Sequence, residues 1–503
     1  MSGASVDPRT PVLVGLGELL RRPAELDAAD LSEPADMMAA AVRLAAEDSG
    51  ATSPDALLSK VGALAAVPPA AWPDGDPGRR VGALLGIASP TLRSSLQGGN
   101  GPQLLLNLLC TRIAAGSLDA GVVCGAEALQ SVVQAGKRGI DLGWPAPDAS
   151  AEPDELVEGE RAPSTEAEVA AGVLAPIMAY PLVENAFRAA SGRTVADHLG
   201  VVSELWSRFS AVAAEQPCAW TPKRYPPEEL ATESAGNRKV TFPYLKLHNS
   251  NIQVDQAAAV IVCSAAVAEE LGVPRDRWVF PHAGAQAADE WMLSHRRELH
   301  RSPAIAACGR AAFAHAGVGP DDLTHVDLYS CFPSAVQLAA DALGLPLDRK
   351  LTMTGGLTFF GGPGNNYATH GVVAVARALR ASEPGTYGLS TALGWYATKH
   401  ALGVYGSSAP ERPFAAFDAD PELPERRESV PAASVAGSEA VAETCTVIYE
   451  RDGSGSYGIL FALLDDGRRA LAQTRDAQVM AAMTGDGFLG SRVRLDAEGG
   501  FTL

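Results

Sequence analysis

The sequence has few cysteines for its length and lacks a long apolar run. Seven cysteines are spread over 503 residues, and no two have the spacing typical of metal ligands. The odd number and the wide spacing indicate reduced thiols, so we expect a cytoplasmic protein and predict no metal site. No apolar stretch approaches the ~20 residues of a membrane span, and no signal-peptide pattern is visible at the start.

Positive charge is also scarce. The chain has 40 Lys and Arg residues against 59 Asp and Glu residues, which gives a formal net charge of -19. Binding to a nucleic acid requires clustered Lys and Arg, so we predict no nucleic-acid partner. A small anionic ligand is compatible with this charge, because a few local cations or a helix N-terminus can bind it.

The order of apolar segments predicts an α/β fold with two similar halves, 1–285 and 286–410. A chain of 503 residues exceeds the roughly 250–300 residues of one hydrophobic core. Strands alternating with helices predict parallel sheets covered on both faces. The first half has predicted strands at 11–16, 61–67, near 94–97, at 120–124 and at 254–264, with helices at 36–46 and 103–115. The same order returns with strands at 278–283, 325–329, 387–393 and 401–405, and helices at 303–316, 334–343 and 371–380.

Two regions depart from this alternation. Residues 126–245 form a long excursion, with an acidic, proline-rich part at 145–166 and a predicted helix over 183–209. Loops of this length are typical of lids and partner surfaces. Residues 411–436 have the composition of a linker. Beyond them, the short predicted strands of 437–503 indicate a small barrel of the oligonucleotide/oligosaccharide-binding (OB) type.

Four blocks, in the right order, resemble those of thiolases. They are Gly98 to Glu127 with Ile113, Gly116 and Asp119 in register, Asp327 to Phe332, Gly355 to Pro363, and Ala392 to Gly394. The turn Gly98 to Gln103 and the additional C-terminal domain are similar to those of actinobacterial type 1 thiolase-like proteins, often labelled acetyl-CoA acetyltransferases. The resemblance implies a duplicated thiolase fold with α-β-α-β-α layers. It also implies coenzyme A or an acyl-CoA as ligand, with no tightly bound cofactor.

The residues at the thiolase catalytic positions differ from those of the family. Gly99 stands where the resemblance places the nucleophilic cysteine, and a shift of one residue places it at Gly98. Gly362 replaces the histidine of "Gly-His-Pro", and Ala392 replaces the second cysteine. Thioester exchange needs a thiolate, so we expect no Cys-dependent thiolase chemistry.

Other polar residues of the same blocks are candidates for a role. We predict Tyr329, Ser330 and His370 as catalytic residues, and Gly98, Gly99, Asn100, Gly101, Asn365 and Asn366 as residues that bind the ligand. His370 has a structural alternative, a hydrogen bond to a nearby backbone group. Cys331 could replace the missing thiol, but we expect it to be a small buried hydrophobe. Thr398 to His400 could hold an anionic group, but we expect a solvated surface run.

Three hypotheses about function follow. The chain binds an acyl-CoA and carries or presents it, performs non-thiolytic acyl-CoA or C–C bond chemistry with Tyr329 and His370, or is a scaffold whose C-terminal domain binds a protein partner. Fold alone does not choose between them. A ligand would lie between the 98–102 turn, the 329–332 strand end and the 362–370 loop. The resemblance is compatible with a monomer or a dimer.

Overall fold

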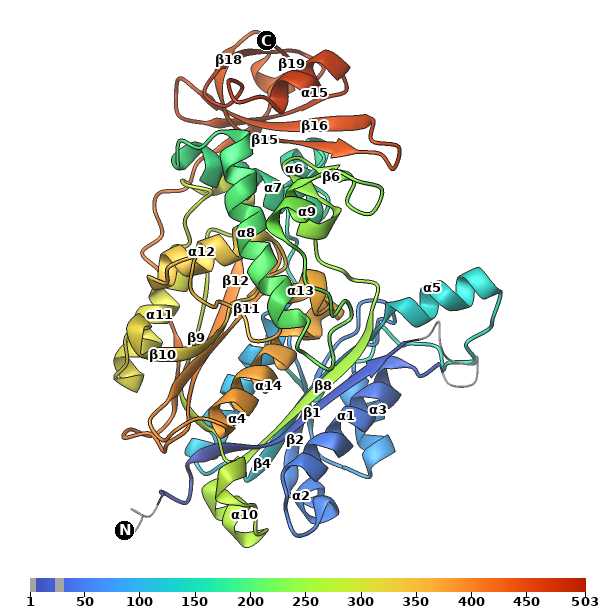
Figure 1. The fold of residues 1–503 in the computed structure, drawn as a ribbon, viewed down its shortest axis with the longest axis vertical. Helices are drawn as coiled ribbons and strands as arrows, with labels where there is room; N and C mark the ends of the chain where they lie inside the picture. The colour runs from blue at the N-terminus through green and yellow to red at the C-terminus, as the bar shows by residue number, and fades with distance from the viewer. Residues whose placement is uncertain (1–5, 23–30) are drawn as a thin grey trace.

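The computed structural model describes residues 6–22 and 31–503, and it contains three β-sheets (Figure 1). The first sheet has the order β1 (Pro11–Arg21), β8 (Asp255–Ser264), β4 (Ala120–Ala128), β2 (Val61–Val67), β3 (Thr91–Arg93) and β5 (Glu155–Leu156). The second has the order β10 (Leu323–Asp327), β11 (Tyr387–Gly394), β12 (Lys399–Gly406), β9 (Phe280–Ala288) and β13 (Ala415–Asp418).

The topology of the two sheets confirms the predicted duplication. The series β2-β4-β8-β1 and the series β10-β11-β12-β9 each contain one parallel pair followed by two antiparallel pairs. The expectation of purely parallel sheets is wrong. The last strand of each half, β8 or β12, is antiparallel to its neighbours. The chain reaches β8 through the long excursion and β12 through a tight turn, and both connections reverse its direction.

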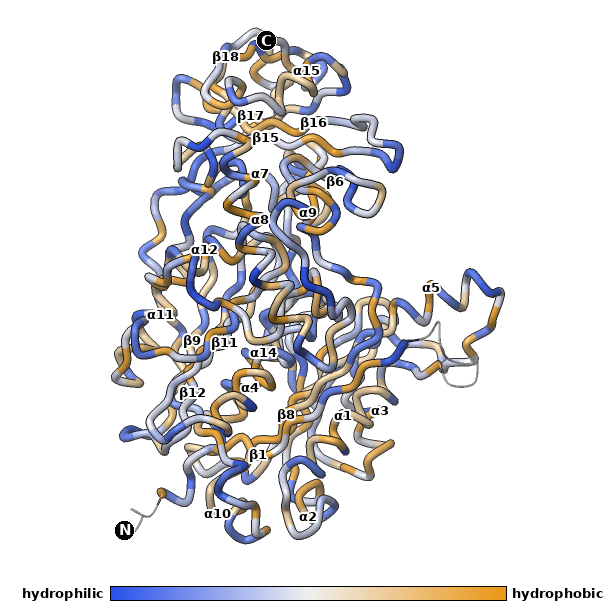
Figure 2. Tube along the Cα trace, in the orientation of Figure 1, coloured by the Kyte–Doolittle hydropathy of each residue, from blue (hydrophilic) through white to orange (hydrophobic). Residues whose placement is uncertain are grey.

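Five layers arise because two helices pack between the sheets. The helices α4 (Gly101–Ala114) and α14 (Tyr367–Arg380) contact strands of both sheets and each other. Residues on several sides of α4 are apolar and buried, which is typical of a helix without a solvent face. The helices α1 (Pro34–Asp48) and α3 (Pro77–Leu85) cover the first sheet, while α11 (Pro303–Ala316) and α12 (Pro333–Leu343) lie beside the second. Figure 2 shows hydrophobic residues along β1 and β8, as this burial requires.

The excursion contains α5 (Leu129–Arg138), α6 (Glu166–Ala170), α7 (Pro176–Ala190), α8 (Val195–Ala213), α9 (Pro227–Ala231), β6 (Lys239–Thr241) and β7 (Tyr244–Leu245). Its later part, with α6, α7, α9 and β6, lies next to the C-terminal unit, whereas its first helix, α5, projects to the side of the first sheet (Figure 1). The single helix predicted over 183–209 is two helices, because Gly192 with a φ of 62° ends the first and Thr194 caps the second. The short strand β5 extends the first sheet by pairing with β3, so it covers an edge that would otherwise expose unpaired backbone groups.

The C-terminal unit is one curved sheet with a short helix. Its strands are β14 (Ser429–Pro431), β17 (Arg469–Thr474), β16 (Gly455–Leu464), β15 (Glu439–Tyr449), β18 (Arg492–Leu495) and β19 (Phe501–Thr502), and α15 spans Ala477–Met483. A hydrogen bond from Gln473 N to Gly499 O brings the segment before β19 back to β17. The β-rich C-terminal domain is confirmed, and its OB type stays a prediction. Of the segment predicted as a linker, β13 joins the second sheet and β14 joins the C-terminal sheet.

The C-terminal sheet packs directly on the rest of the molecule. Ile459, Phe461 and Leu471 belong to the same hydrophobic core as the second sheet, and β15 pairs with β6 of the excursion. The guanidinium of Arg469 is fully buried at this junction. It donates to both carboxylate oxygens of Glu443 and to two backbone carbonyls of the segment 294–296.

Within the described ranges 6–22 and 31–503, no helix combines the length and the apolar character needed to cross a bilayer.

Replacing Arg469 should loosen the C-terminal unit. The change Arg469→Met leaves the Glu443 carboxylate and two buried carbonyls without their donors, and we expect a loss of about 3 kcal/mol in the free energy of unfolding. Chemical denaturation measures this loss. The matched control is Arg468→Met, because Arg468 pairs with Asp466 on the surface and its loss should leave stability unchanged. Equal stability of the two variants would contradict the role assigned to Arg469.

Candidate functional site

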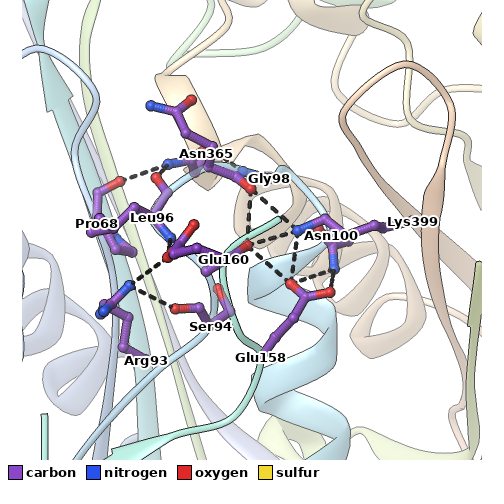
Figure 3. Close-up of polar contacts among 12 residues, drawn as sticks. Pro68, Arg93, Ser94, Leu96, Gly98, Asn100, Glu158, Glu160, Asn365 and Lys399 are labelled. Atoms are coloured by element: carbon purple, nitrogen blue, oxygen red, sulfur yellow. Dashed lines mark hydrogen bonds and ion pairs between the residues drawn. The ribbon is translucent and has the colours of Figure 1, made fainter. Parts of the chain in front are cut away.

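The glycine turn before α4 is held rigidly by side chains from distant segments. Gly98 has a φ of 151°, which favours glycine. Its backbone N–H donates to Asn365 Oδ1 at 2.9 Å, and the amide of Asn365 donates to the carbonyls of Pro68 and Leu96 at 3.0 and 2.9 Å (Figure 3). Asn365 was predicted to bind a ligand, but in the structure its side-chain amide bonds to backbone groups of the protein.

The second glycine of the turn touches a tyrosine of the other half. A β-carbon added to Gly99 would lie 2.2 Å from the hydroxyl oxygen of Tyr329 and 2.7 Å from Leu393 O. The phenol therefore occupies the space that a side chain at position 99 would need. Burial raises the pKa of Tyr329, so at neutral pH it is an uncharged hydrogen-bond donor.

The other two altered positions have different surroundings. A β-carbon at Gly362 would make ordinary contacts, 3.4 Å from Asn251 O and 3.4 Å from Leu357 Cδ2. Ala392 is buried in β11. It lines an apolar cavity, shared with Tyr329 and Cys308, that has room for about one water molecule. This cavity is too small for an acyl chain.

Large side chains fill the region where the ligand was expected. Phe359, Phe360 and Tyr367 are each no more than 1% exposed. The ring of Tyr367 contacts that of Tyr329, with centroids 5.3 Å apart, and also that of Phe360. The rings of Tyr367 and Phe360 therefore pack next to Tyr329, in the region between the 329–332 strand end and the 362–370 loop.

His370 faces the first sheet. Its Nδ1 is 2.6 Å from Glu18 Oε1 on β1, and Arg377 pairs with the same carboxylate. Burial raises the pKa of Glu18, but His370 and Arg377 outweigh this effect and hold it below its usual value. The imidazole ring packs on Phe360, with centroids 5.1 Å apart. Phe360 and Tyr367 thus lie between His370 and Tyr329.

Ser330 belongs to a buried network of structural hydrogen bonds. Its hydroxyl is 3.3 Å from the hydroxyl of Tyr367, which is 2.6 Å from Thr354 Oγ1. Thr354 in turn contacts the buried carboxylate of Asp327. Tyr329 and Ser330 therefore both contact Tyr367, one through its ring and the other through its hydroxyl, whereas His370 contacts Glu18 and Phe360.

Two further predicted residues have internal partners. The amide of Asn366 donates to Gly125 O at 2.7 Å, and Thr369 donates to Asn366 Oδ1. Cys331 is buried, as expected, and burial raises the pKa of its thiol to about 12. A thiol in this environment is a poor nucleophile at neutral pH.

The prediction of a solvated run at Thr398 to His400 is wrong. All three residues are at most 5% exposed. The ammonium of Lys399 is 2.8 Å from Glu158 Oε2, and His400 Nε2 is 3.0 Å from Asp289 Oδ2. They are buried because β12 begins at Lys399, inside the second sheet, rather than at residue 401. The partner of Lys399 comes from the excursion, 241 residues away, so no local pattern pointed to it.

Comparison with known proteins connects the fold with a protein family. The family description "Thiolase-like protein type 1 additional C-terminal domain" matches residues 422–500. The crystal structure of a monomeric SCP2-thiolase-like protein type 1 from Mycobacterium smegmatis matches with a TM-score of 0.81 and 30% identity, over 99% of each chain. The dimeric peroxisomal thiolase of Saccharomyces cerevisiae matches with a TM-score of 0.56 and 14% identity, over 80% of this chain and 98% of that one. This last likeness concerns the fold alone.

A curated relative matches a shorter part. An acetyl-CoA acetyltransferase of Methanothermobacter thermautotrophicus is 32% identical over 123 residues, which is 24% of this chain and 31% of that protein. The alignment thus spans about a third of the curated relative.

The contact between Gly99 and Tyr329 is open to a direct test. In Gly99→Ala the new methyl group collides with the phenol and with Leu393 O, and we expect a loss of about 1–3 kcal/mol in the free energy of unfolding. The matched control is Gly362→Ala, whose methyl group makes ordinary contacts, so its stability should equal or exceed that of the wild type. Denaturant unfolding of both variants measures the two free energies of unfolding. A Gly99→Ala variant as stable as the control would contradict the prediction, because it would show that the phenol moves aside at little cost in free energy.

Proposed function

Because this chain belongs to the type 1 thiolase-like proteins, as its motifs predicted, we propose that it binds an acyl-CoA without transferring the acyl group through a cysteine. The contact between the Tyr329 hydroxyl and Gly99 carries this proposal. Thioester exchange in thiolases needs a thiolate at this position, and here a neutral phenol fills it.

The binding half of the proposal is supported by the fold and by the names of the relatives. Both the SCP2-thiolase-like protein and the acetyltransferase are named after proteins of acyl-CoA chemistry. Tyr329 is then the hydrogen-bond donor best placed to meet a thioester oxygen, because its hydroxyl lies at the start of α4, where the helix dipole also favours negative charge. Entry of the acyl group requires the rings at 359–367 to move.

The closed packing favours a second candidate function. If the aromatic rings do not move, the chain is a scaffold, and its C-terminal unit is the surface that binds a protein partner. Catalysis by Tyr329 with His370 is less favoured, because two aromatic rings separate them.

We also propose that the protein acts as a monomer in the cytoplasm. Strand β5 of the same chain lies on the edge of β3, and the relative from Mycobacterium smegmatis is described as monomeric. The seven cysteines are all free thiols, which suits a reducing compartment.

Purified protein should not form acetoacetyl-CoA from acetyl-CoA at rates typical of thiolases. The reason is the absence of a side chain at Gly99, together with Gly362 and Ala392 at two other catalytic positions. A coupled assay of acetyl-CoA condensation, repeated after a second purification, measures this. Sustained turnover would refute the proposal.

Calorimetric titration with acetyl-CoA tests the binding. We expect saturable binding that weakens about tenfold in Tyr329→Phe, because one hydrogen bond to the thioester is lost. The matched control is Tyr457→Phe, whose hydroxyl contacts Gly172 O near the C-terminal sheet and which should bind like the wild type. Absence of any binding by the wild-type protein would leave the scaffold function.

A further inference from the structure

A buried lysine next to the glycine turn pairs with a carboxylate from a distant segment. The Lys399 side chain is 4% exposed, and its ammonium donates to Ser95 Oγ at 2.7 Å, to Gln97 O at 3.2 Å and to Glu158 Oε2 at 2.8 Å. A buried cation needs a negative partner, since its desolvation is costly. Glu158 supplies that charge from a segment far away in the sequence.

The same carboxylate is surrounded by further polar groups. Oε2 of Glu158 lies 3.0 Å from Ser95 Oγ and 3.3 Å from Asn100 Nδ2. Asn100 immediately precedes α4, a helix of 14 residues, so the carboxylate also lies near the positive end of a helix dipole. Figure 3 shows Glu158 reaching across this helix to Asn100 and Lys399. The side chain of Asn100 is almost completely buried, so its amide Nδ2 is held beside the carboxylate as a hydrogen-bond donor.

Glu158 is part of a segment that residues elsewhere in the chain hold in place. We call residues 154–162 the strap. Glu155 pairs with Arg112, Glu160 pairs with Arg93 and accepts from Leu96 N, and Ala162 O accepts from the indole of Trp291. These partners lie on both sides of Glu158, so its side chain could leave Lys399 while the rest of the strap stays bound.

A groove gives access to the carboxylate from solvent. Glu158 is 25% exposed. Together with Asn100, Lys399 and Trp291 it lines an open groove with a volume of about 260 Å³. A small molecule in this groove would meet Glu158 before it meets Lys399.

We propose that Lys399, Ser95 and Asn100 form a binding site for a carboxylate, and that Glu158 occupies this site as an internal ligand. An external carboxylate binds by displacing the Glu158 side chain into the groove. One ammonium matches one negative charge, and the present occupant is itself a planar carboxylate, which favours this ligand class over a phosphate. The inference is independent of acyl-CoA binding at Tyr329.

Chemical rescue of a Glu158 variant tests the proposal. In Glu158→Ala the Lys399 ammonium loses its partner, so the thermal midpoint should fall below that of the wild type. Sodium acetate should raise that midpoint in a saturable manner compared with sodium chloride at equal ionic strength, since a ligand of the folded state stabilises it. The wild type should show a much smaller response, because Glu158 competes with acetate.

Two further variants provide the controls. The double variant Glu158→Ala/Lys399→Met should not respond to acetate, because the cation is absent. Glu160→Ala removes a carboxylate of the same strap that contacts Arg93 rather than Lys399, and it should respond like the wild type. An equal acetate response in Glu158→Ala and in either control overturns the proposal.

A conservative variant keeps the test decisive if Glu158→Ala does not fold. Glu158→Gln preserves the shape of the side chain, and calorimetry should detect acetate binding that is tighter than in the wild type, where Glu158 competes for the same site. No binding by this variant overturns the proposal. Inorganic phosphate is the comparison ligand: a response as large as that to acetate overturns the carboxylate assignment and makes this a general anion site.

Discussion

Gly98 and Gly99 lie where the two halves of the fold touch. A β-carbon on Gly98 would stand 2.7 Å from the ammonium of Lys399, and one on Gly99 would stand 2.2 Å from the hydroxyl of Tyr329. Both partners belong to the second half, so the halves approach closely only because the turn has no side chains. Much of the surrounding structure follows from this approach. Lys399 is buried and requires Glu158, and Tyr329 is buried and packs against Tyr367.

The same constraint changes what the thiolase fold offers chemically. In the thiolase family the start of this helix activates a nucleophile, whereas here Tyr329 from the other half fills that place. The helix dipole of α4 remains, and a carboxylate from the strap uses it. A site that binds a reacting group in relatives has become a site of contact between segments of one chain. Strand β5 then covers the neighbouring sheet edge, which agrees with a protein that functions without a second copy.

The sequence predicted the fold better than the site. The order of apolar segments was sufficient to predict the duplicated topology, because it depends on local periodicity and spacing. The four ordered blocks carried the resemblance to thiolases. The site depends on pairs that are distant in sequence. Thr398 to His400 looked like a polar surface run, and only the position of β12 shows that they are buried. His370 was a reasonable acid–base candidate by residue type, yet its partner is Glu18 on β1, and no local pattern links positions so far apart.

The distribution of charge explains how an acidic chain holds its additional segments. Although the net charge is -19, cations with little exposure stand where later segments join the thiolase core. Arg469 binds Glu443 at the C-terminal sheet, and Lys399 binds Glu158 of the strap. Buried pairs of this kind contribute little net stability compared with apolar packing, but the loss of one partner is costly. Their main effect is therefore to favour one arrangement of the segments over the alternatives. A strap that missed Lys399 would leave that cation buried and unpaired, and a C-terminal unit that missed the core would leave Arg469 without its two backbone acceptors in the segment 294–296. The strap and the C-terminal unit therefore each have one favoured position on the core.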